Sequence, residues 1–496
     1  MDEKKKVIII GAGPGGLTSA MILSHKGYDV TVYEKKEMVG GRNAPIRING
    51  YTFDTGPTFL MMKFILDEVF RETGRDSSDY LDFIKLDPMY RLVFKDKELE
   101  LSPDHEVTKK NISKVFPGQE KYYDDFYETE KKRFDHMFPC LQKDYSNRRA
   151  FFRPIFLKAI RWLSLNKSLF ERLGDYYGPR DLRLGFTFQS KYLGMSPWDC
   201  PGAFTIIPYV EHGFGIYHTI GGLSAISDAM AKVVGEEGGK IKLKTPVKEI
   251  IVENGTAKGV VLEDGSKEYA DAVIVNADFG YAMTNLFPKG VLKKYSTGNM
   301  EKKKMSCSTF MLYLGIDKTY DEVPQHTIFF AEDYEENIKD IFHNMKLSED
   351  ISFYIRNASV NDPTLAPEGK SNIYVLVPIT NTRADIDWEI EKGPMRDLVL
   401  ENIKERTPLK DIDEHIEVEK IITPADWENE YDVYKGATFN LAHNLLQMLY
   451  FRPHNRFEEV KKCYIVGGGT HPGSGLPTIY ESGRISANLL MKDLGV

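Results

Sequence analysis

Two glycine-rich segments, one near each end of the chain, restrict the possible folds more than any other feature. Residues 7–10 are apolar and lead into the run GAGPGG at 11–16, and residues 464–466 lead into three glycines at 467–469. Short apolar runs rich in β-branched residues are typical of buried parallel strands. Both glycine runs are followed by residues that can begin a helix. We therefore expect the two ends of the chain to meet over one flat ligand that carries phosphate groups.

The N-terminal glycines have the spacing of a dinucleotide-binding turn, G-x-G-x-x-G. Gly11 is expected to make the tight turn, Gly13 to let the backbone approach a pyrophosphate, and Gly16 to let the next helix pack against the strand. That helix, expected over residues 14–26, directs the free N–H groups of its first turn, which contains Gly15, towards the phosphates. The motif alone is weak evidence, so the residues after it decide its meaning.

The residues after this helix support a dinucleotide and indicate which one. A second strand, expected at 29–33, ends on Glu34, an acidic residue at the position where ribose hydroxyls are bound. Lys35 follows, and a further glycine pair ends at Gly41 and precedes Arg42. This extension resembles flavoproteins with two dinucleotide-binding domains, a family that includes amine oxidases and carotenoid desaturases. The resemblance implies that Arg42 lies against the phosphates of FAD, whereas nicotinamide dehydrogenases have no such extension.

Two more segments resemble the same flavoproteins. Residues 51–58 are similar to the family's segment near the isoalloxazine ring, and the C-terminal run 466–477 resembles a signature of the bacterial-type phytoene desaturases. Members often have a glycine where this chain has Thr478, a difference that affects the geometry under the ring and leaves the fold unchanged. The expected FAD-binding residues are Gly11, Gly13, Gly15, Gly16, Glu34, Lys35, Gly41, Arg42, Gly56, Pro57, Thr58, Val247, Gly468, Gly469, Leu476, Pro477 and Thr478.

The resemblance to bacterial-type phytoene desaturases covers nearly the whole chain, with further matches in order at 365–369, 388–394, 423–424 and 451–456. It implies a carotenoid desaturase that introduces C=C bonds into a long isoprenoid by hydride transfer to the flavin, with oxygen or a membrane quinone as electron acceptor. The alternatives are a carotenoid cis–trans isomerase, another carotenoid oxidoreductase of the same family and a flavin amine oxidase. A non-catalytic prenyl-lipid carrier is disfavoured by the intact phosphate-binding glycines.

No residue is assigned as a catalytic acid or base from the sequence. His471 is expected to be a turn histidine bonded to the backbone, because a single histidine without an orienting partner is weak evidence for a base. The stretch 382–388, with Arg383, Asp385 and Asp387, fits a solvated loop at least as well as a catalytic site.

The composition excludes several classes of protein. A net charge of −8 gives no overall basic field for nucleic acid. The four cysteines are far apart and form no C-x-x-C pair, which argues against a disulfide framework or a zinc site and fits a reducing cytoplasm. The 11 histidines are scattered, so no metal site is predicted. We find neither a signal peptide pattern nor an apolar run of about 18 or more residues that would span a membrane.

The order of the patterns predicts an α/β protein with a Rossmann-like FAD-binding domain of the two-dinucleotide-binding-domain type. This domain is expected to be discontinuous, over residues 1–105, 215–285 and 440–496. Residues 106–214 have mostly helical patterns and are expected to form a substrate- or membrane-contacting region. Residues 286–439 contain alternating strand patterns at 310–315, 351–356 and 373–378, which predict an inserted α+β substrate-binding domain with a mixed sheet.

A basic and aromatic segment at 148–163 has the composition of an interfacial helix. Its charges are all basic, and its apolar residues include phenylalanine, tryptophan and leucine, as in helices that lie on anionic membranes. A core helix whose basic side chains reach water fits the same pattern. Combined with the resemblance to enzymes of water-insoluble polyenes, the segment predicts a cytoplasmic protein that binds the membrane peripherally through residues 148–165.

Overall fold

The computed structural model describes residues 4–495. Its α-helices are α1 (Pro14–His25), α2 (Lys63–Arg71), α3 (His105–Val115), α4 (Glu120–Leu141), α5 (Pro154–Ala159), α6 (Leu169–Leu173), α7 (Arg180–Gly185), α8 (Ile206–Phe214), α9 (Ser224–Glu236), α10 (Phe279–Asn285), α11 (Thr297–Met300), α12 (Tyr334–Lys339), α13 (Trp388–Arg406), α14 (Pro424–Asn429) and α15 (Leu476–Leu494). Its strands are β1 (Lys6–Ile10), β2 (Asp29–Tyr33), β3 (Pro45–Ile48), β4 (Tyr51–Asp54), β5 (Leu60–Met61), β6 (Phe83–Lys85), β7 (Tyr90–Val93), β8 (Glu98–Leu101), β9 (Ile216–Thr219), β10 (Lys240–Lys242), β11 (Val247–Glu253), β12 (Thr256–Leu262), β13 (Lys267–Tyr269), β14 (Ala272–Val275), β15 (Ser308–Ile316), β16 (His326–Phe329), β17 (Phe353–Asn357), β18 (Ser371–Ile379), β19 (Ile416–Ile422) and β20 (Cys463–Ile465). Short helical turns used below are η3 (Arg148–Phe152), η4 (Ile160–Trp162), η5 (Phe188–Leu193), η12 (Leu445–Gln447) and η13 (Leu449–Phe451).

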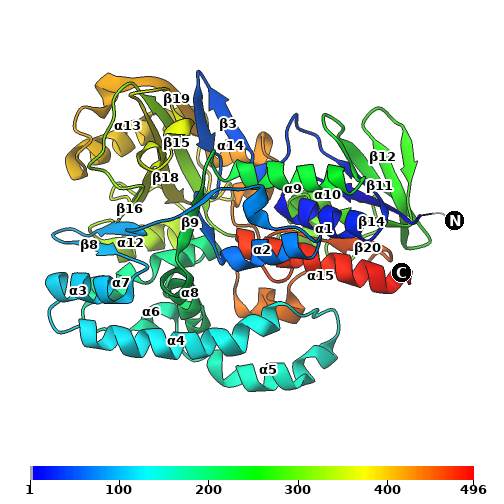
Figure 1. The fold of residues 1–496 in the computed structure, drawn as a ribbon, viewed down its shortest axis with the longest axis horizontal. Helices are drawn as coiled ribbons and strands as arrows, with labels where there is room; N and C mark the ends of the chain where they lie inside the picture. The colour runs from blue at the N-terminus through cyan, green and yellow to red at the C-terminus, as the bar shows by residue number, and fades with distance from the viewer. Residues whose placement is uncertain (1–3, 496) are drawn as a thin grey trace.

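Figure 1 shows the arrangement of these elements in three parts. An α/β part on the right contains β1 and α15 from the two ends of the chain. A second part at the upper left contains a sheet covered by α13, and a group of helices that includes α4 and α5 lies along the bottom.

A five-stranded parallel sheet forms the centre of the α/β part. Its strand order is β10-β2-β1-β14-β20, so β1 pairs with β2 on one side and with β14 on the other. Val7 and Ile9 of β1 face a layer of helices in which α1 packs against α9 and α15. Ile8 and Ile10 face the antiparallel sheet β11-β12-β13. Because side chains alternate along a strand, burial on both faces explains the uninterrupted apolar run of β1.

A seven-stranded mixed sheet forms the second part, in the order β19-β15-β18-β17-β16-β7-β8. It contains the strands expected at 310–315, 351–356 and 373–378, which are β15, β17 and β18. Helix α13 covers one face, where Trp388 packs into the cluster that includes β15 and β18 side chains. Strands β7 and β8 also belong to this sheet, because β7 pairs in parallel with β16, although they lie within the first segment assigned to the FAD-binding domain. The division into domains stays a prediction.

Residues 106–214 are mostly helical, as expected. The segment 148–163 does not form the single interfacial helix that its composition suggested, and this prediction was wrong. It is divided into η3, α5 and η4. Arg153, which precedes Pro154, has extended dihedral angles of −65° and 138°, because a residue before proline disfavours the helical conformation. No helix within residues 4–495 combines the length and apolar character required to cross a membrane.

A buried polar network joins the two sheet-containing parts. Arg356 on β17 donates from Nη1 to Asp54 Oδ2 at 2.7 Å and from Nη2 to His218 Nδ1 at 3.2 Å. His218 Nε2 therefore carries the proton and donates to Asp362 Oδ2 at 2.9 Å. Burial lowers the pKa of His218, in agreement with a neutral ring. Asp54 Oδ1 also accepts the Leu223 N–H at 2.8 Å, so the network fixes β4, β9 and β17 relative to one another.

We predict that Arg356→Met will lower the free energy of unfolding by about 3–5 kcal/mol, because it leaves the buried Asp54 carboxylate without its cation. Urea unfolding followed by fluorescence measures the change. The matched control is Arg91→Met on β7 of the same sheet, where the partly exposed pair with Glu100 contributes about 0–1 kcal/mol. Equal losses of unfolding free energy in the two variants would show that the buried network contributes no more than a partly exposed ion pair.

Candidate active site

A cavity of about 750 Å³ lies at the carboxyl ends of β1, β2 and β14. Ligands of open parallel sheets bind at this edge. At one end the cavity is lined by Gly11, Glu34 and Asn276, and at the other it reaches Tyr354 and Leu376 of the seven-stranded sheet. One continuous space therefore connects the nucleotide-binding turn with the second part of the molecule.

The glycine turn packs around the side chain of Asn276, which follows β14. Asn276 Nδ2 donates to Gly11 O at 3.0 Å. A Cβ atom on Gly13 would lie 3.0 Å from Asn276 Nδ2, and one on Gly15 would lie 2.9 Å from Asn276 Oδ1. Gly11 itself has a φ angle of +94°, which favours glycine. Part of the requirement for glycine therefore comes from this asparagine, in addition to any ligand.

Two helix N-termini point to the same cavity. Gly13 is the N-cap of α1 and Gly475 is the N-cap of α15, and neither N-terminus has a side chain that caps it. Both N-cap residues line the cavity. The first-turn N–H groups of these helices are thus available to a ligand, and the helix dipoles favour negative charge there.

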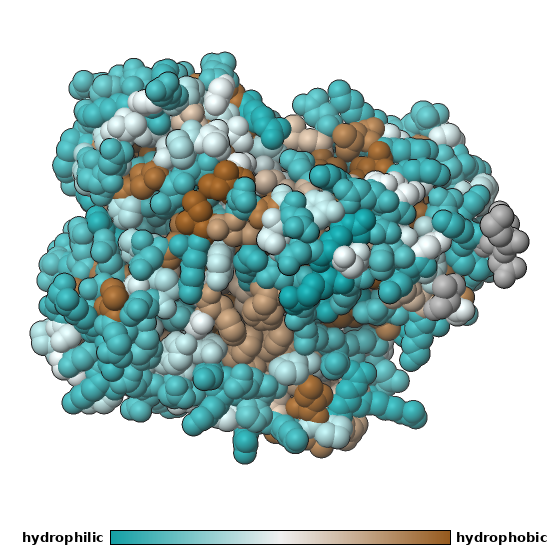
Figure 2. All heavy atoms as spheres, viewed as in Figure 1, coloured by the Kyte–Doolittle hydropathy of each residue, from teal (hydrophilic) through white to brown (hydrophobic). Residues whose placement is uncertain are grey.

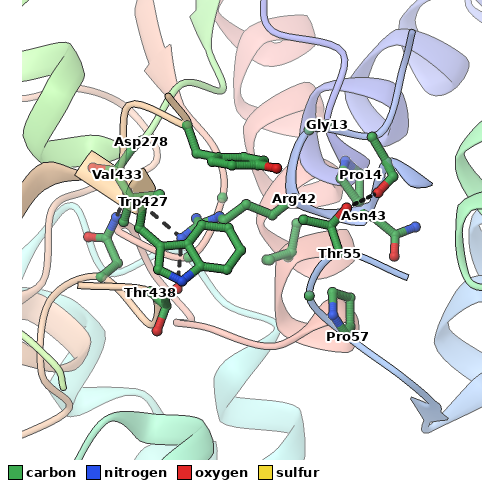
Figure 3. A pocket seen from close by; sticks show the side chains of 18 of the residues that line it. Gly13, Pro14, Arg42, Asn43, Thr55, Pro57, Asp278, Trp427, Val433 and Thr438 are labelled. Atoms are coloured by element: carbon green, nitrogen blue, oxygen red, sulfur yellow. Dashed lines mark hydrogen bonds and ion pairs between the residues drawn. The ribbon is translucent and has the colours of Figure 1, made fainter. Parts of the chain in front are cut away.

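Charged side chains surround the nucleotide end of the cavity. Glu34 is buried, and its two carboxylate oxygens accept the backbone N–H groups of Ala12 at 2.8 Å and Lys36 at 2.9 Å. Arg42 donates from Nη1 to Thr438 O at 2.7 Å. In Figure 3 the Arg42 side chain extends towards Asp278, whose Oδ2 lies 3.9 Å from Arg42 Nη1.

Asp278 organises the loops behind this arginine. Its Oδ1 accepts the N–H groups of Gly280 and Tyr281 at the start of α10, and its Oδ2 accepts the Asn440 amide at 2.6 Å. Burial raises the pKa of Asp278, and the charge of Arg42 opposes that effect.

The other half of the cavity is aromatic. Phe59, Phe188 and Tyr192 line it together with Tyr354, whose hydroxyl lies 2.9 Å from Thr58 Oγ1. The same hydroxyl lies 2.6 Å from Nδ1 of the buried His326. Burial lowers the pKa of His326 well below its usual value, so the ring stays neutral and Nδ1 accepts the phenol proton. This half of the cavity therefore presents to a ligand the surfaces of aromatic rings, together with hydroxyls that are already hydrogen-bonded within the protein.

Two further histidines near the C-terminal glycines are hydrogen-bonded to the backbone. His443 donates from Nδ1 to Leu193 O at 3.0 Å, and its Nε2 accepts the Ser474 N–H at 3.1 Å. His471 is bonded to Leu141 O at 2.9 Å, and burial lowers its pKa to about 4. The backbone-bonded interpretation of His471 is confirmed.

The polar stretch 382–388 does not line the cavity. Arg383 donates to the carbonyls of Glu301 and Lys303, and Asp387 caps α13. These contacts give the stretch a structural role.

Most of the residues expected to bind FAD line the cavity, and they are Gly11, Gly13, Glu34, Lys35, Gly41, Arg42, Gly56, Pro57, Thr58, Val247, Gly468, Gly469, Leu476 and Pro477. Gly15 and Gly16 do not line it, since they lie in the first turn of α1, where a Cβ atom on Gly16 would collide with Gly11 O. Thr478 does not line it either. Its hydroxyl donates to Ser474 O at 2.8 Å, a carbonyl at the start of its own helix.

Comparison with known proteins identifies the family. Residues 14–491 match the model described as flavin containing amine oxidoreductase. A 4,4'-diapophytoene desaturase (4,4'-diapolycopene-forming) from Methylomonas sp is 53% identical over 490 residues, which are 99% of this chain and 96% of that protein. A zeta-carotene-forming phytoene desaturase from Myxococcus xanthus is 34% identical over 496 residues, with coverage of 99% of this chain and 94% of the relative.

Solved structures share the architecture at low sequence identity. Putrescine oxidase bound to putrescine is 14% identical and covers 100% of both chains with a TM-score of 0.65. Cyclohexylamine oxidase from Brevibacterium oxydans IH-35A is also 14% identical and covers 100% of both chains, with a TM-score of 0.62. These likenesses confirm the expected fold class. The chain therefore belongs to the flavin containing amine oxidoreductases and, within them, to the carotenoid desaturase family, whose cofactor is FAD.

Proposed function

We propose that this chain is an FAD-dependent desaturase that introduces C=C bonds into a linear isoprenoid of the 4,4'-diapophytoene type. The main observation behind the proposal is that one continuous cavity contains two uncapped helix N-termini at one end and the aromatic half at the other. The name of the Methylomonas relative supports this substrate class.

The residues at the nucleotide end fit FAD. The N-termini of α1 and α15 offer N–H groups to phosphate and to an electron-rich ring edge. Asn43 also faces this cavity, and its buried Oδ1 has no hydrogen-bond partner within residues 4–495, so a ribose hydroxyl or a ring N–H can satisfy it. In the proposed arrangement Glu34 binds ribose and Arg42 binds pyrophosphate.

When bound, FAD supplies a two-electron acceptor that can take a hydride from carbon. The contribution of the protein is to hold the polyene in an extended, dry position beside it. Phe59, Phe188 and Tyr192 provide the aromatic surface for an apolar chain. Thr58 and Tyr354 are hydrogen-bonded to each other, so they add polarity without an unsatisfied group.

We also propose that the protein takes its water-insoluble substrate from an anionic membrane. Two segments that are distant in sequence lie together, because the Phe151 and Tyr450 rings are 6.1 Å apart and Arg148 Nε donates to Tyr450 OH. The basic-apolar patch formed by these segments comprises the exposed residues Phe152, Leu157, Ile160, Leu165, Leu445, Leu446, Phe451, Arg148, Arg149, Lys158 and Arg161. Figure 2 shows apolar residues at the lower edge of the molecule, where Figure 1 places α5. Exposed apolar side chains beside basic ones match the surface of an anionic bilayer.

Gly13→Val should abolish retention of FAD, because its side chain would enter the space of the pyrophosphate and press on Asn276. Glu34→Ala should weaken retention by removing the proposed ribose contact. The measurement is the FAD content per chain after gel filtration, with circular dichroism to confirm folding. Gly235→Val on α9 is the matched control, since a Cβ atom there meets nothing within 4 Å. A folded Gly13→Val protein with full FAD content would disprove the assignment of the turn.

Anaerobic mixing of the flavin-loaded protein with 4,4'-diapophytoene should bleach the flavin absorbance and produce a pigment that absorbs at longer wavelength. The reason is that each new C=C bond removes two electrons from the substrate and extends its conjugation. A change in pigment without flavin reduction would identify a cis–trans isomerase. Bleaching by a primary amine, but not by the polyene, would identify an amine oxidase.

Replacement of Phe152, Leu157 and Leu446 by serine should release the protein from liposomes that contain anionic lipid, as measured by flotation. These side chains are 77%, 53% and 75% exposed, whereas Phe156 in the same segment is buried and unsuitable for substitution. Binding of the wild type should also fall as salt rises, since the basic residues contribute by electrostatic attraction. The control is Ile390→Ser, a 66% exposed position on α13 outside the patch. Unchanged flotation of the triple variant would exclude the patch as the membrane contact.

A further inference from the structure

One basic side chain lies in the aromatic half of the cavity. Lys191, on η5, lines this half beside Phe188 and Tyr192 and is 9% exposed. Among residues 4–495 it is the one lysine that is buried. Burial of an ammonium group without a charged partner is unfavourable, because the group loses its hydration. Packing alone therefore does not explain a lysine at this position.

The neighbours of the Lys191 amine offer no negative charge. Nζ donates to Ser352 Oγ at 3.3 Å and lies 4.9 Å from the centre of the Tyr334 ring. The titratable groups that face it are the phenol of Tyr334 and the thiol of Cys307, and burial raises the pKa values of both. Burial also lowers the pKa of Lys191 to about 7, so a neutral amine is present at physiological pH.

Hydrogen bonds connect η5, the turn that carries Lys191, to the C-terminal glycine segment. Leu193, in the same helical turn as Lys191, accepts a hydrogen bond from His443. His443 in turn accepts the N–H of Ser474, which lies one residue before the N-cap of α15. The helical turn that carries Lys191 is therefore held next to the C-terminal glycine segment, which lines the same cavity.

Four other titratable groups on or behind the cavity wall are poorly suited to accept a proton from carbon. Glu34 and Asp278 lie at the nucleotide end, where both accept backbone N–H groups. Burial raises the pKa of the Tyr354 phenol, so the hydroxyl stays protonated and cannot accept a proton. His326 lies behind Tyr354, and burial holds its pKa well below the usual value.

We propose that Lys191 is the catalytic proton acceptor of the desaturation, an inference that rests on the function proposed above. As one substrate carbon gives a hydride to the flavin, the adjacent carbon loses a proton to the neutral ε-amine. The electrons of that C–H bond form the new C=C bond, and the amine becomes an ammonium ion. Ser352 Oγ and the face of the Tyr334 ring stabilise the ammonium until it returns the proton to water.

The test compares the wild type with Lys191→Met, which keeps the length of the side chain but cannot accept a proton. In single-turnover assays the wild-type rate of desaturation should rise with pH and level off above about 7, as the amine loses its proton. Lys191→Met should be slower by about 10²-fold or more and should lose this pH dependence. Ethylamine added to Lys191→Ala should restore part of the rate. Lys339→Met, at a half-exposed position on α12, is the matched control.

A second measurement is independent of catalysis. Pulse acetylation across a range of pH, followed by mass spectrometry, should show Lys191 reacting with a midpoint near 7, whereas exposed lysines follow values of about 10.4. Bound FAD and polyene affinity should be unchanged in Lys191→Met, as measured by absorbance and fluorescence quenching. Lys191→Met that desaturates at the wild-type rate with the wild-type pH profile would overturn the proposal, while the function would stand. A wild-type chain that desaturates no polyene would overturn both.

Discussion

The close packing of glycine backbone around one asparagine is the constraint on which the rest of the site depends. Asn276 follows β14, the strand between β1 and β20, and its side chain lies against the glycine turns that follow those two strands. Because Gly15 has no Cβ atom, the start of α1 can lie close to the start of α15: a Cβ atom on Gly15 would lie 3.2 Å from Ile479 Cγ2 in the first turn of α15. Two uncapped N-termini are thereby directed at one ligand. A larger residue at these contacts would separate the helices before any cofactor was bound.

A buried network of four side chains fixes the position of one end of the cavity relative to the other. It consists of Asp54, Arg356, His218 and Asp362. It joins β4 and β9 to β17, so the aromatic wall on the seven-stranded sheet is held at a fixed position from the nucleotide end. A buried ion pair is a weak source of net stability, but loss of one partner is costly. The network therefore favours one relative placement of the two parts over alternatives, which suits a cavity that must accommodate a rigid cofactor beside a long ligand.

Local sequence patterns predicted the parts of the site that depend on backbone conformation. The alternation and length of apolar runs located β1, β15 and β18, and the glycine spacing located the turn after β1. Asn276, Tyr354 and Lys191 were missed, because each acts through neighbours that are distant in the chain and belongs to no local motif. The single helix expected at 148–163 failed because composition does not report the break that Pro154 imposes. Thr478 lies outside the cavity lining, and its hydroxyl bonds to the carbonyl of Ser474 behind it.

The position of β20 and α15 has a consequence for the order in which the molecule can form. Strand β20 forms one edge of the parallel sheet, and α15 packs directly on α1, so elements that are more than 400 residues apart are neighbours in the native structure. During translation, Leu17 on α1 and its apolar neighbours can pack against α15 only after nearly all of the residues between these two helices have been synthesised. Contacts of such long sequence separation close slowly and leave apolar surface exposed in the nascent chain. The nucleotide site can therefore be completed only after β20 and α15 have been synthesised.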